Sequence, residues 1–234
     1  MFIDKCKDFF IRYSHSWVLL YFFIYMPWFN YLEATVTTDS TYTLIYSPID
    51  DLIPFNELFV IPYILWFAYV AAAVLYFLFF AKKSDFYKLT GFLFSGMTIC
   101  LIIYTFFPNG QGLRLTEFPR DNFLVVLVKS FYNNDTPTNV CPSIHCFNSI
   151  GVSIAILTCD KLKNKHFIKI SSTIMTILIM LSTCFIKQHS IVDMFGAIVL
   201  SVILFSIIYL PSYIKKADTY NINTEQKKFS LFAK

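Results

Sequence analysis

The stretch that decides the fold is Leu58–Phe80, LFVIPYILWFAYVAAAVLYFLFF, which contains no charged residue. A helix needs roughly 20 mostly apolar residues to cross a membrane, so this segment predicts a transmembrane helix. The composition points the same way, because 56% of the 234 residues are hydrophobic, 15% are charged and the mean hydropathy is +0.58. A soluble domain carries about 25% charged residues. The composition therefore argues against a soluble globular enzyme and excludes a disordered chain.

Working outward from this segment, five further stretches are apolar enough to be membrane spans. They are Trp17–Tyr31, Leu89–Phe107, Cys146–Cys159, Ile170–Ile186 and Ile191–Leu210. We therefore predict an all-α, polytopic helical bundle with about six transmembrane helices. A cleaved signal peptide is the competing interpretation of the first stretch. It is disfavoured because Pro27, Trp28 and Phe29 stand where the small residues of a cleavage site are needed.

The charges sort by side when the N-terminus is placed inside the membrane. Lys and Arg are biased towards cytoplasmic loops, and with six spans 15 of the 19 fall on inner segments. The outer segments keep Arg114, Arg120, Lys129 and Lys187. The outer side also holds the acidic residues Glu33, Asp39, Asp50, Asp51, Glu57, Glu117, Asp121, Asp135 and Asp193. This sorting predicts that both termini are cytoplasmic, and it supports the fourth span, which is short and less apolar.

The chain contains no internal repeat and no Gly/Ser linker. We expect one membrane-embedded domain over residues 1–214, followed by a polar cytoplasmic tail over residues 215–234. The two long outer connections, about residues 32–57 and 108–145, are of the length that often carries function. The acids of the first connection are expected to serve mainly as helix starts, with contact to a lipid head group as the alternative. The composition, rich in Phe, Ile, Lys and Asn, is typical of an AT-rich genome and points to a bacterial plasma membrane.

Neither a metal nor a nucleic acid is expected as a partner. Cys141 and Cys146 flank His145, but a zinc site needs four ligands at recognised spacings, which the sequence does not supply. The sequence leaves open a disulfide between Cys141 and Cys146. A net charge of +4 is too weak to indicate nucleic-acid binding. The expected partners are the lipid bilayer and a membrane lipid, without a cofactor.

Ionisable groups at membrane depth are costly and therefore suggest function. Two clusters stand at the predicted outer edge, Cys141–His145 and Lys187–Asp193. His189 and Asp193 are four residues apart and would share one face of a helix. An Asp that accepts a hydrogen bond from one imidazole nitrogen leaves the other nitrogen free to act as a nucleophile or base. Taken singly, each group also fits a structural role at a helix end, such as an acid in the first turn.

A third polar segment, Pro108–Arg114, leaves the third predicted span on the same side. Its two glycines allow backbone amides to approach an anion. The guanidinium of Arg114 is a planar fork that suits phosphate.

Together the three segments resemble the signature of the type-2 phosphatidic acid phosphatase superfamily, which reads K-x6-R-P, then P-S-G-H, then S-R-x5-H-x3-D. The second motif stands here as Pro142-Ser143-Ile144-His145. The third stands as Ser182-Thr183, five residues, His189, three residues and Asp193. The resemblance covers about residues 89–200 in order, spacing and predicted side.

Four positions depart from the family pattern. Phe107 stands for the Lys of the first motif and Leu115 for its Pro, while Ile144 replaces Gly and Thr183 replaces Arg. Two phosphate-binding cations are thus missing. In lacking the arginine, the chain is similar to the branch that contains inositol phosphorylceramide synthases and related lipid phosphotransferases. The sequence leaves open whether Arg120, Lys129 or Lys187 compensates.

The resemblance implies a metal-independent reaction in a pocket at the outer membrane surface. It implies that His189 attacks phosphorus, that Asp193 orients His189, and that His145 protonates the leaving oxygen and then activates water or an alcohol. It assigns Arg114 and Ser143 to the phosphoryl oxygens. A bell-shaped pH profile follows, because a neutral His189 and a protonated His145 must coexist. Further candidates for the pocket are Gln111, Asn139, Asn148 and Lys187.

These expectations leave three functions in competition. The leading one is a hydrolase of a lipid phosphate or pyrophosphate. The second is a phosphotransferase that passes a head group to an alcohol through the same histidine. A non-enzymatic transporter or binding module is the third, and it would be favoured by paired charges near the middle of the membrane and by broken helices, neither of which the sequence suggests.

Overall fold

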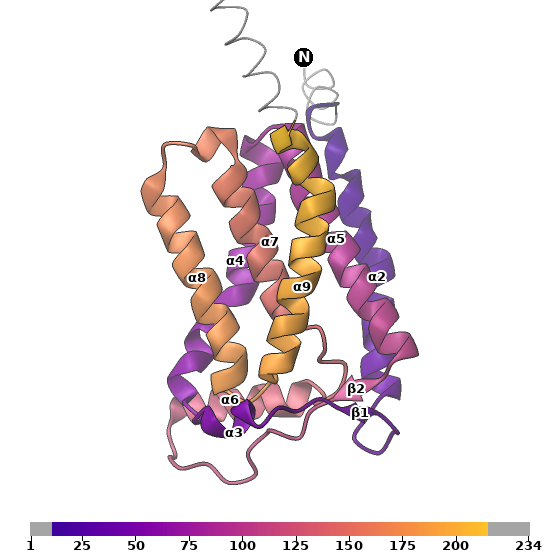
Figure 1. The fold of residues 1–234 in the computed structure, drawn as a ribbon, viewed down its shortest axis with the longest axis vertical. Helices are drawn as coiled ribbons and strands as arrows, with labels where there is room; N and C mark the ends of the chain where they lie inside the picture. The colour runs from indigo at the N-terminus through magenta and orange to yellow at the C-terminus, as the bar shows by residue number, and fades with distance from the viewer. Residues whose placement is uncertain (1–10, 215–234) are drawn as a thin grey trace, which may run out of the picture.

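The structure is a computed structural model that describes residues 11–214, so the predicted tail at residues 215–234 lies outside the described residues. It is mainly helical, and its long helices stand side by side (Figure 1). In chain order they are the 3-10 helix η1 (Ser14–Tyr21) continued by α2 (Phe22–Thr35), then α4 (Val60–Phe80), α5 (Lys83–Phe106), α7 (Ile144–Thr158), α8 (His166–Phe185) and α9 (Ile191–Ile208).

Four helical segments are long and apolar enough to cross a membrane, namely Glu57–Phe80, Lys83–Phe106, His166–Phe185 and Ile191–Ile208. They coincide with four of the predicted spans, and the protein is a helical membrane protein on this evidence. The fourth predicted span is the shorter apolar helix Ile144–Thr158. The first differs from the expectation because a 3-10 segment precedes α2, which continues beyond residue 31 to Thr35.

Helix α7 is the centre of the bundle, since it packs against α4, α5, α8 and α9. Its position explains why its sequence is less apolar than a lipid-facing helix. Small and polar residues such as Ser149 and Gly151 are buried there and allow neighbouring helices to approach. The Thr176 hydroxyl of α8 donates to the Ser149 carbonyl at 3.0 Å, which ties the two helices together.

The contact of α5 with α7 depends on two glycines that face aromatic rings. A Cβ added at Gly96 of α5 would lie 1.9 Å from the Phe147 ring, and one at Gly151 of α7 would lie 2.6 Å from the Phe92 ring. The rings of Phe92 and Phe147 stack with centroids 4.9 Å apart. Each helix thus supplies one ring and one glycine, and this reciprocal packing fixes the register of α7.

One end of the bundle carries most of the non-helical chain, and we call it the α6 end (Figure 1). Helix α6 (Phe123–Asn134) lies across this end, together with the short helix α3 (Ile49–Leu52). The strands β1 (Thr43–Leu44) and β2 (Asn109–Gly110) pair in parallel and join the two long connections there. Helix α6 was not predicted, because the segment 108–145 was expected to be a loop.

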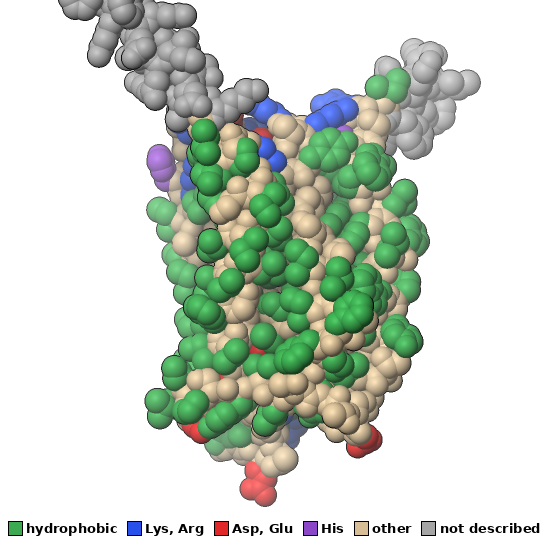
Figure 2. Space-filling view, turned by 45° about the vertical axis from the view of Figure 1, so that its right-hand side comes forward, with side chains coloured by type: hydrophobic (Ala, Val, Ile, Leu, Met, Phe, Trp, Pro, Cys, Tyr) green, Lys and Arg blue, Asp and Glu red, His purple; other side chains and the backbone are tan. Residues whose placement is uncertain are grey.

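Charge is distributed unevenly over the surface. On the face shown in Figure 2, hydrophobic side chains cover the sides of the bundle, most blue side chains lie at the upper end and exposed acids lie at the lower end. The upper end holds the η3 turn (Asp160–Leu162) and the link between α4 and α5, where the lysines cluster. The lower end is the α6 end.

Candidate active site

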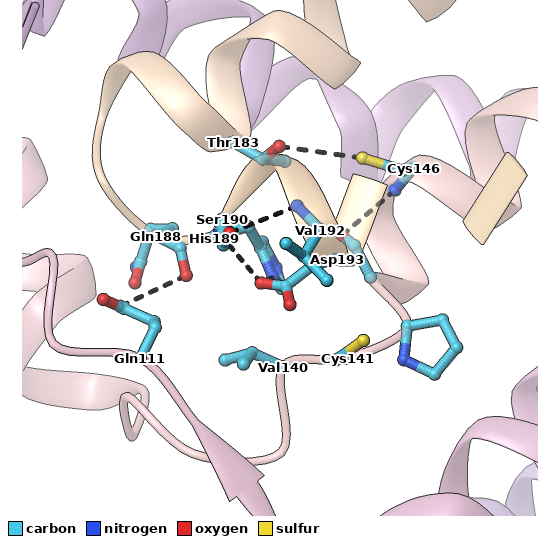
Figure 3. A network of polar contacts seen from close by, with 12 residues as sticks. Gln111, Val140, Cys141, Cys146, Thr183, Gln188, His189, Ser190, Val192 and Asp193 are labelled. Carbon is cyan, nitrogen blue, oxygen red and sulfur yellow. Dashed lines mark hydrogen bonds and ion pairs between the residues drawn. The ribbon is translucent and has the colours of Figure 1, made fainter. Parts of the chain in front are cut away.

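The turn between α8 and α9 positions His189 and Asp193 through a helix cap. Ser190 is the N-cap of α9: its Oγ accepts a hydrogen bond from the Val192 amide at 3.1 Å, and Asp193 reaches back to accept one from the Ser190 amide at 2.9 Å. This reciprocal capping box satisfies amides that have no partner within the helix. The same Oδ2 of Asp193 lies 3.1 Å from Nδ1 of His189 (Figure 3).

The contact between His189 and Asp193 therefore has a different origin from the one predicted. His189 lies in the turn before α9 and not on a helix face. The chain bends so that its ring meets the carboxylate that caps the helix. Asp193 is fully buried, and with Nδ1 of His189 directed to it the other ring nitrogen, Nε2, remains available for chemistry.

His145, in the first turn of α7, faces His189 with ring centroids 5.6 Å apart. Its ring stacks on Tyr63 at 4.7 Å and contacts Trp66 at 4.3 Å, both on α4. Among the described residues, none forms a hydrogen bond with this ring. Aromatic packing thus fixes the orientation of His145 while leaving its nitrogens uncommitted.

Backbone contacts hold the two motifs together. Ser143 is the N-cap of α7, with its Oγ accepting from the Cys146 amide at 3.4 Å, and its own amide donates to the Asp193 carbonyl at 3.1 Å. Ser143 is fully buried and lies outside the pocket lining. Here it joins the start of α7 to the start of α9, which sets the spacing between the histidines.

The first long connection reaches the same turn through Asp50. The buried carboxylate of Asp50 accepts from the Ser190 hydroxyl at 2.6 Å and from the Ile191 amide at 2.8 Å. The Nζ of Lys187 donates to the carbonyls of Asp50 at 2.7 Å and Ile53 at 2.5 Å. Lys187 has φ of 56°, a strained conformation for a residue with a long side chain. These contacts oppose the strain and hold the turn in place.

Gln111 and Arg114 also support the turn. The Gln111 amide donates to the carbonyls of Lys187 at 3.2 Å and Gln188 at 3.3 Å. The Arg114 guanidinium donates to three carbonyls, those of Tyr132, Asp135 and Thr136, at 2.7 to 2.9 Å, and to Oε1 of Gln188 at 2.6 Å. In this structure Arg114 lies outside the pocket lining, and its terminal N–H groups donate to carbonyls of the chain and to Gln188.

Both histidines line a pocket between α2, α5, the start of α7 and the α8–α9 turn. The polar residues of its lining are Glu33, Asp135, Thr136, Thr138, Asn139, His145, Gln188 and His189. Glu33 of α2 accepts from the Thr136 hydroxyl at 2.6 Å and from Nδ2 of Asn139 at 3.0 Å. The segment that follows α6 is thereby pinned to α2.

Asp135 is the more unusual acid of the pocket. Burial, reinforced by the nearby charge of Glu33, raises the pKa of Asp135 from its ordinary value of 3.8 to about 6, against the opposing effects of Arg114 and His189. Among the described residues, none donates a hydrogen bond to its carboxylate. A half-buried carboxylate without a donor is destabilised in its charged form, so this side chain is poised to accept a donor or a proton.

The predicted site residues thus divide into two groups. His145, His189 and Asn139 line the pocket, and Asp193 stands directly behind His189. The remaining candidates lie outside the lining: Arg114, Ser143, Gln111, Asn148 and Lys187. Asn148 is buried in α7, and its Oδ1 has no partner among the described residues.

Sequence reasoning missed several contributors to the pocket. Glu33 and Asp135 were recognised only as outer acids, and Tyr63 and Trp66 carried no motif that linked them to a histidine. The one available signal was that Asp135 lies in a polar turn just before the second motif.

The three cations that were candidates to replace the missing ones are engaged elsewhere. Arg120 pairs with Glu57 at 2.6 Å, Lys129 lies over the Phe118 ring at 5.1 Å, and Lys187 is bound to carbonyls. None of them lines the pocket.

The cysteines near the site are thiols. Cys141 and Cys146 are both free, so the disulfide left open by the sequence is not formed. Burial and the adjacent charge of Asp193 raise the pKa of the Cys141 thiol to about 12, so it stays protonated. Within residues 11–214, no three His, Cys, Asp or Glu side chains cluster so as to hold a metal ion.

Comparison with known proteins gives no assignment, because no family model, no curated protein and no solved structure matches the chain.

Proposed function

We propose that the protein is a membrane-embedded enzyme that cleaves a phosphate ester or pyrophosphate bond of a lipid through a phosphohistidine on His189. One observation carries the proposal: two histidines face each other in one pocket, and only His189 is held by a buried carboxylate. This asymmetry gives the two rings different tasks. Asp193 accepts the Nδ1–H of His189, which leaves the lone pair of Nε2 free to attack phosphorus and offsets the positive charge that the ring gains in the phosphohistidine, while His145 remains free to exchange a proton.

The reaction proceeds in two steps. Nε2 of His189 attacks phosphorus, the bond to the leaving oxygen breaks, and protonated His145 supplies the proton that this oxygen needs. In the second step His145 removes a proton from water, whose oxygen attacks phosphorus and releases His189. Asp193 holds the Nδ1–H of His189 throughout. These steps use only side chains of the chain itself, and Arg114 would contact a phosphoryl oxygen only by exchanging its present carbonyl partners.

The same proposal includes the membrane arrangement. Six helical segments cross the bilayer, both termini are cytoplasmic, and the α6 end faces outward in a bacterial plasma membrane. The lysines gathered at the opposite end support this orientation. The resemblance to the type-2 phosphatidic acid phosphatase superfamily supports the reaction class.

A lipid phosphotransferase is the second candidate, and the charge of the pocket favours it. Glu33 and Asp135 line the pocket together, whereas no Lys or Arg lines it. Like charges repel strongly where water is scarce, so this pocket disfavours a dianionic phosphate monoester and suits a singly charged phosphodiester. An acceptor alcohol would then replace water in the second step.

The test is turnover by the purified protein in detergent with a chelator present. We expect cleavage of at least one lipid from a panel of phosphatidic acid, isoprenyl pyrophosphate and phosphodiester lipids, with an acid-labile phosphoryl group on the protein. His189→Ala abolishes both signals, and His145→Ala abolishes turnover. His166→Ala, at the exposed start of α8, is the matched control and retains activity. Turnover that survives both site substitutions, or that needs a divalent metal, contradicts the mechanism.

Adding candidate acceptor alcohols to this assay separates the two functions. A hydrolase forms the same product at every alcohol concentration, whereas a transferase forms a new phosphodiester and releases less of the water product.

Orientation is tested by labelling single cysteines in intact cells with a membrane-impermeant maleimide. We expect Glu117→Cys, at the α6 end, to be labelled and Ser84→Cys, at the opposite end, to be labelled only after permeabilisation; both positions are exposed in the structure. The chain with its native cysteines alone gives the background.

A further inference from the structure

The pocket contains more than the reacting pair requires, because a second part of its lining, which we call the acceptor wall, carries the hydrogen-bond acceptors of Glu33, Asp135 and Asn139. Resting on the proposed function, we infer that Glu33, Asp135 and Asn139 form a subsite for the primary ammonium group of a phosphodiester lipid, one with a head group of the phosphoethanolamine type. The subsite would hold the head group while His189 attacks its phosphorus.

Two acceptors of this wall, Oδ1 of Asn139 and the Asp135 carboxylate, have no hydrogen-bond donor among the described residues. Asn139 is 7% exposed, its Nδ2 is used by Glu33, and its Oδ1 has no partner among the described residues. The hydrogen bond to Glu33 fixes which end of the amide is free. Buried acceptors without donors are costly, so Asn139 calls for a ligand that brings donors, and the half-buried Asp135 carboxylate of the same pocket can accept from that ligand too.

The charge of this wall also favours a cationic ligand. Glu33 and Asp135 lie close enough for the charge of Glu33 to raise the pKa of Asp135. A cation near both carboxylates would relieve this repulsion. Arg114 does not fill this role, because its terminal donors point to carbonyls and to Gln188.

A primary ammonium fits this wall better than other head groups do. A quaternary ammonium has charge but no N–H donor, so it would leave Oδ1 of Asn139 unsatisfied. A polyol head group has donors but no charge, so it would leave the acid pair uncompensated. A primary ammonium supplies three donors and one positive charge, which matches the acceptors of this wall.

Nε2 of His189 bonds to phosphorus, the bond from phosphorus to the diacylglycerol oxygen breaks, and His145 gives that oxygen its proton. The phosphoethanolamine group remains on His189 with its ammonium in the subsite. Water or an alcohol then attacks phosphorus, and His145 takes the proton released.

The experiment compares diacylglycerol release from phosphatidylethanolamine, phosphatidylcholine and phosphatidylglycerol with identical acyl chains in mixed micelles. We expect kcat/KM to be about tenfold or more higher for phosphatidylethanolamine, the range of a charge-assisted hydrogen bond. Asp135→Asn and Glu33→Gln should each reduce this preference to about threefold or less, through KM as well as kcat. Asp121→Asn, an exposed acid of the same connection, is the control that keeps the preference.

The outcomes distinguish the subsite from the reaction. Equal rates for the three lipids, or a preference that both variants retain, overturn the subsite while the phosphohistidine proposal stands. Cleavage of phosphatidic acid, with none of the three phosphodiester lipids cleaved, also overturns the subsite and leaves the phosphohistidine proposal standing. Failure to phosphorylate His189 with any lipid overturns the reaction and the subsite together. Thermal unfolding of each variant shows that it is folded, and having two variants keeps the test decisive if one of them is not.

Discussion

The Asp50 carboxylate accepts a hydrogen bond from the Ser190 hydroxyl at 2.6 Å, although 140 residues separate them in the chain. A second hydrogen bond, from the Ile191 amide at 2.8 Å, places the same carboxylate at the positive end of α9. The first long connection therefore caps the last described helix, next to His189. Acids in that connection were expected to serve as helix starts, and Asp50 does so for a helix far along the chain.

Asp50→Asn should lower kcat by about 10- to 100-fold, the range found when a group that orients a functional side chain is removed. The amide retains one acceptor but places a donor against Ser190 and Ile191. KM should change little, because Asp50 does not line the pocket. The matched control is Asp51→Asn, since Asp51 is exposed and, within residues 11–214, accepts a hydrogen bond from Tyr46 alone. Equal kinetics for the two variants would contradict a positioning role.

Asp193→Asn should lower kcat by about 10²- to 10⁴-fold, as expected for the loss of a carboxylate that fixes a histidine tautomer. Its amide oxygen can still cap Ser190, so the fold should survive. Ser190→Ala tests the opposite case: it removes the cap and costs about 1 kcal/mol of stability but retains the carboxylate. A larger loss of kcat in Ser190→Ala than in Asp193→Asn would contradict the orienting role of Asp193.

Asp135→Asn should stabilise the protein at pH 8 and have no effect near pH 4. The pKa of Asp135 is about 6 in the folded chain against an ordinary 3.8, so the folded state binds the proton more tightly. Its ionisation therefore costs the folded state about 2 to 3 kcal/mol, a cost incurred as pH rises from about 4 to above 6. The charged or titratable groups around it are Glu33, Arg114, His145 and His189, together with the tyrosines Tyr25, Tyr63 and Tyr104.

The measurement for Asp135 is the difference in unfolding midpoint between variant and wild type, in one detergent at one heating rate. That difference should shrink as the pH falls through 6. A difference that is the same at pH 8 and pH 4 would show that Asp135 does not titrate as described.

Gly96→Ala should destabilise the bundle by about 1 to 3 kcal/mol, because the added methyl group overlaps the Phe147 ring. Gly91→Ala, on the same helix, is the control, since nothing lies within 4 Å of its added Cβ. Alanine favours helix by up to about 1 kcal/mol over glycine, so the control should equal or exceed wild type in thermal unfolding. Equal behaviour of the two variants would contradict the close packing of α5 on α7.

The long helices were predictable because each contains a long apolar stretch. Helices α4, α5, α8 and α9 coincide with uncharged or nearly uncharged stretches, and hydropathy alone locates such stretches. Helix α6 was missed because its apolar run, Phe123–Val128, is far shorter than the roughly 20 residues that a membrane span needs. The 3-10 start of the first helix has no sequence signal that we recognise.

For the site, the sequence could identify the pairs that lie close along the chain. His189 and Asp193 fall within one cap, so their spacing was informative, although the contact comes from a turn. The partners of Arg114 could not be foreseen, because they are backbone carbonyls of a segment some 20 residues away. The place of Glu33 in the pocket depends on how α2 packs, and no local pattern encodes that packing.

The histidines and the acceptor wall are held by different parts of this molecule. The histidines are fixed by the central helix α7, the cap of α9 and the rings of α4, whereas the acceptor wall comes from α2 and the connection after α6. Substitutions in that connection therefore have scope to change which lipid is selected without moving the reacting nitrogens. A set of chains that share His145, His189 and Asp193 but differ at residues 33 and 135–139 would be expected to share one chemistry and differ in head group.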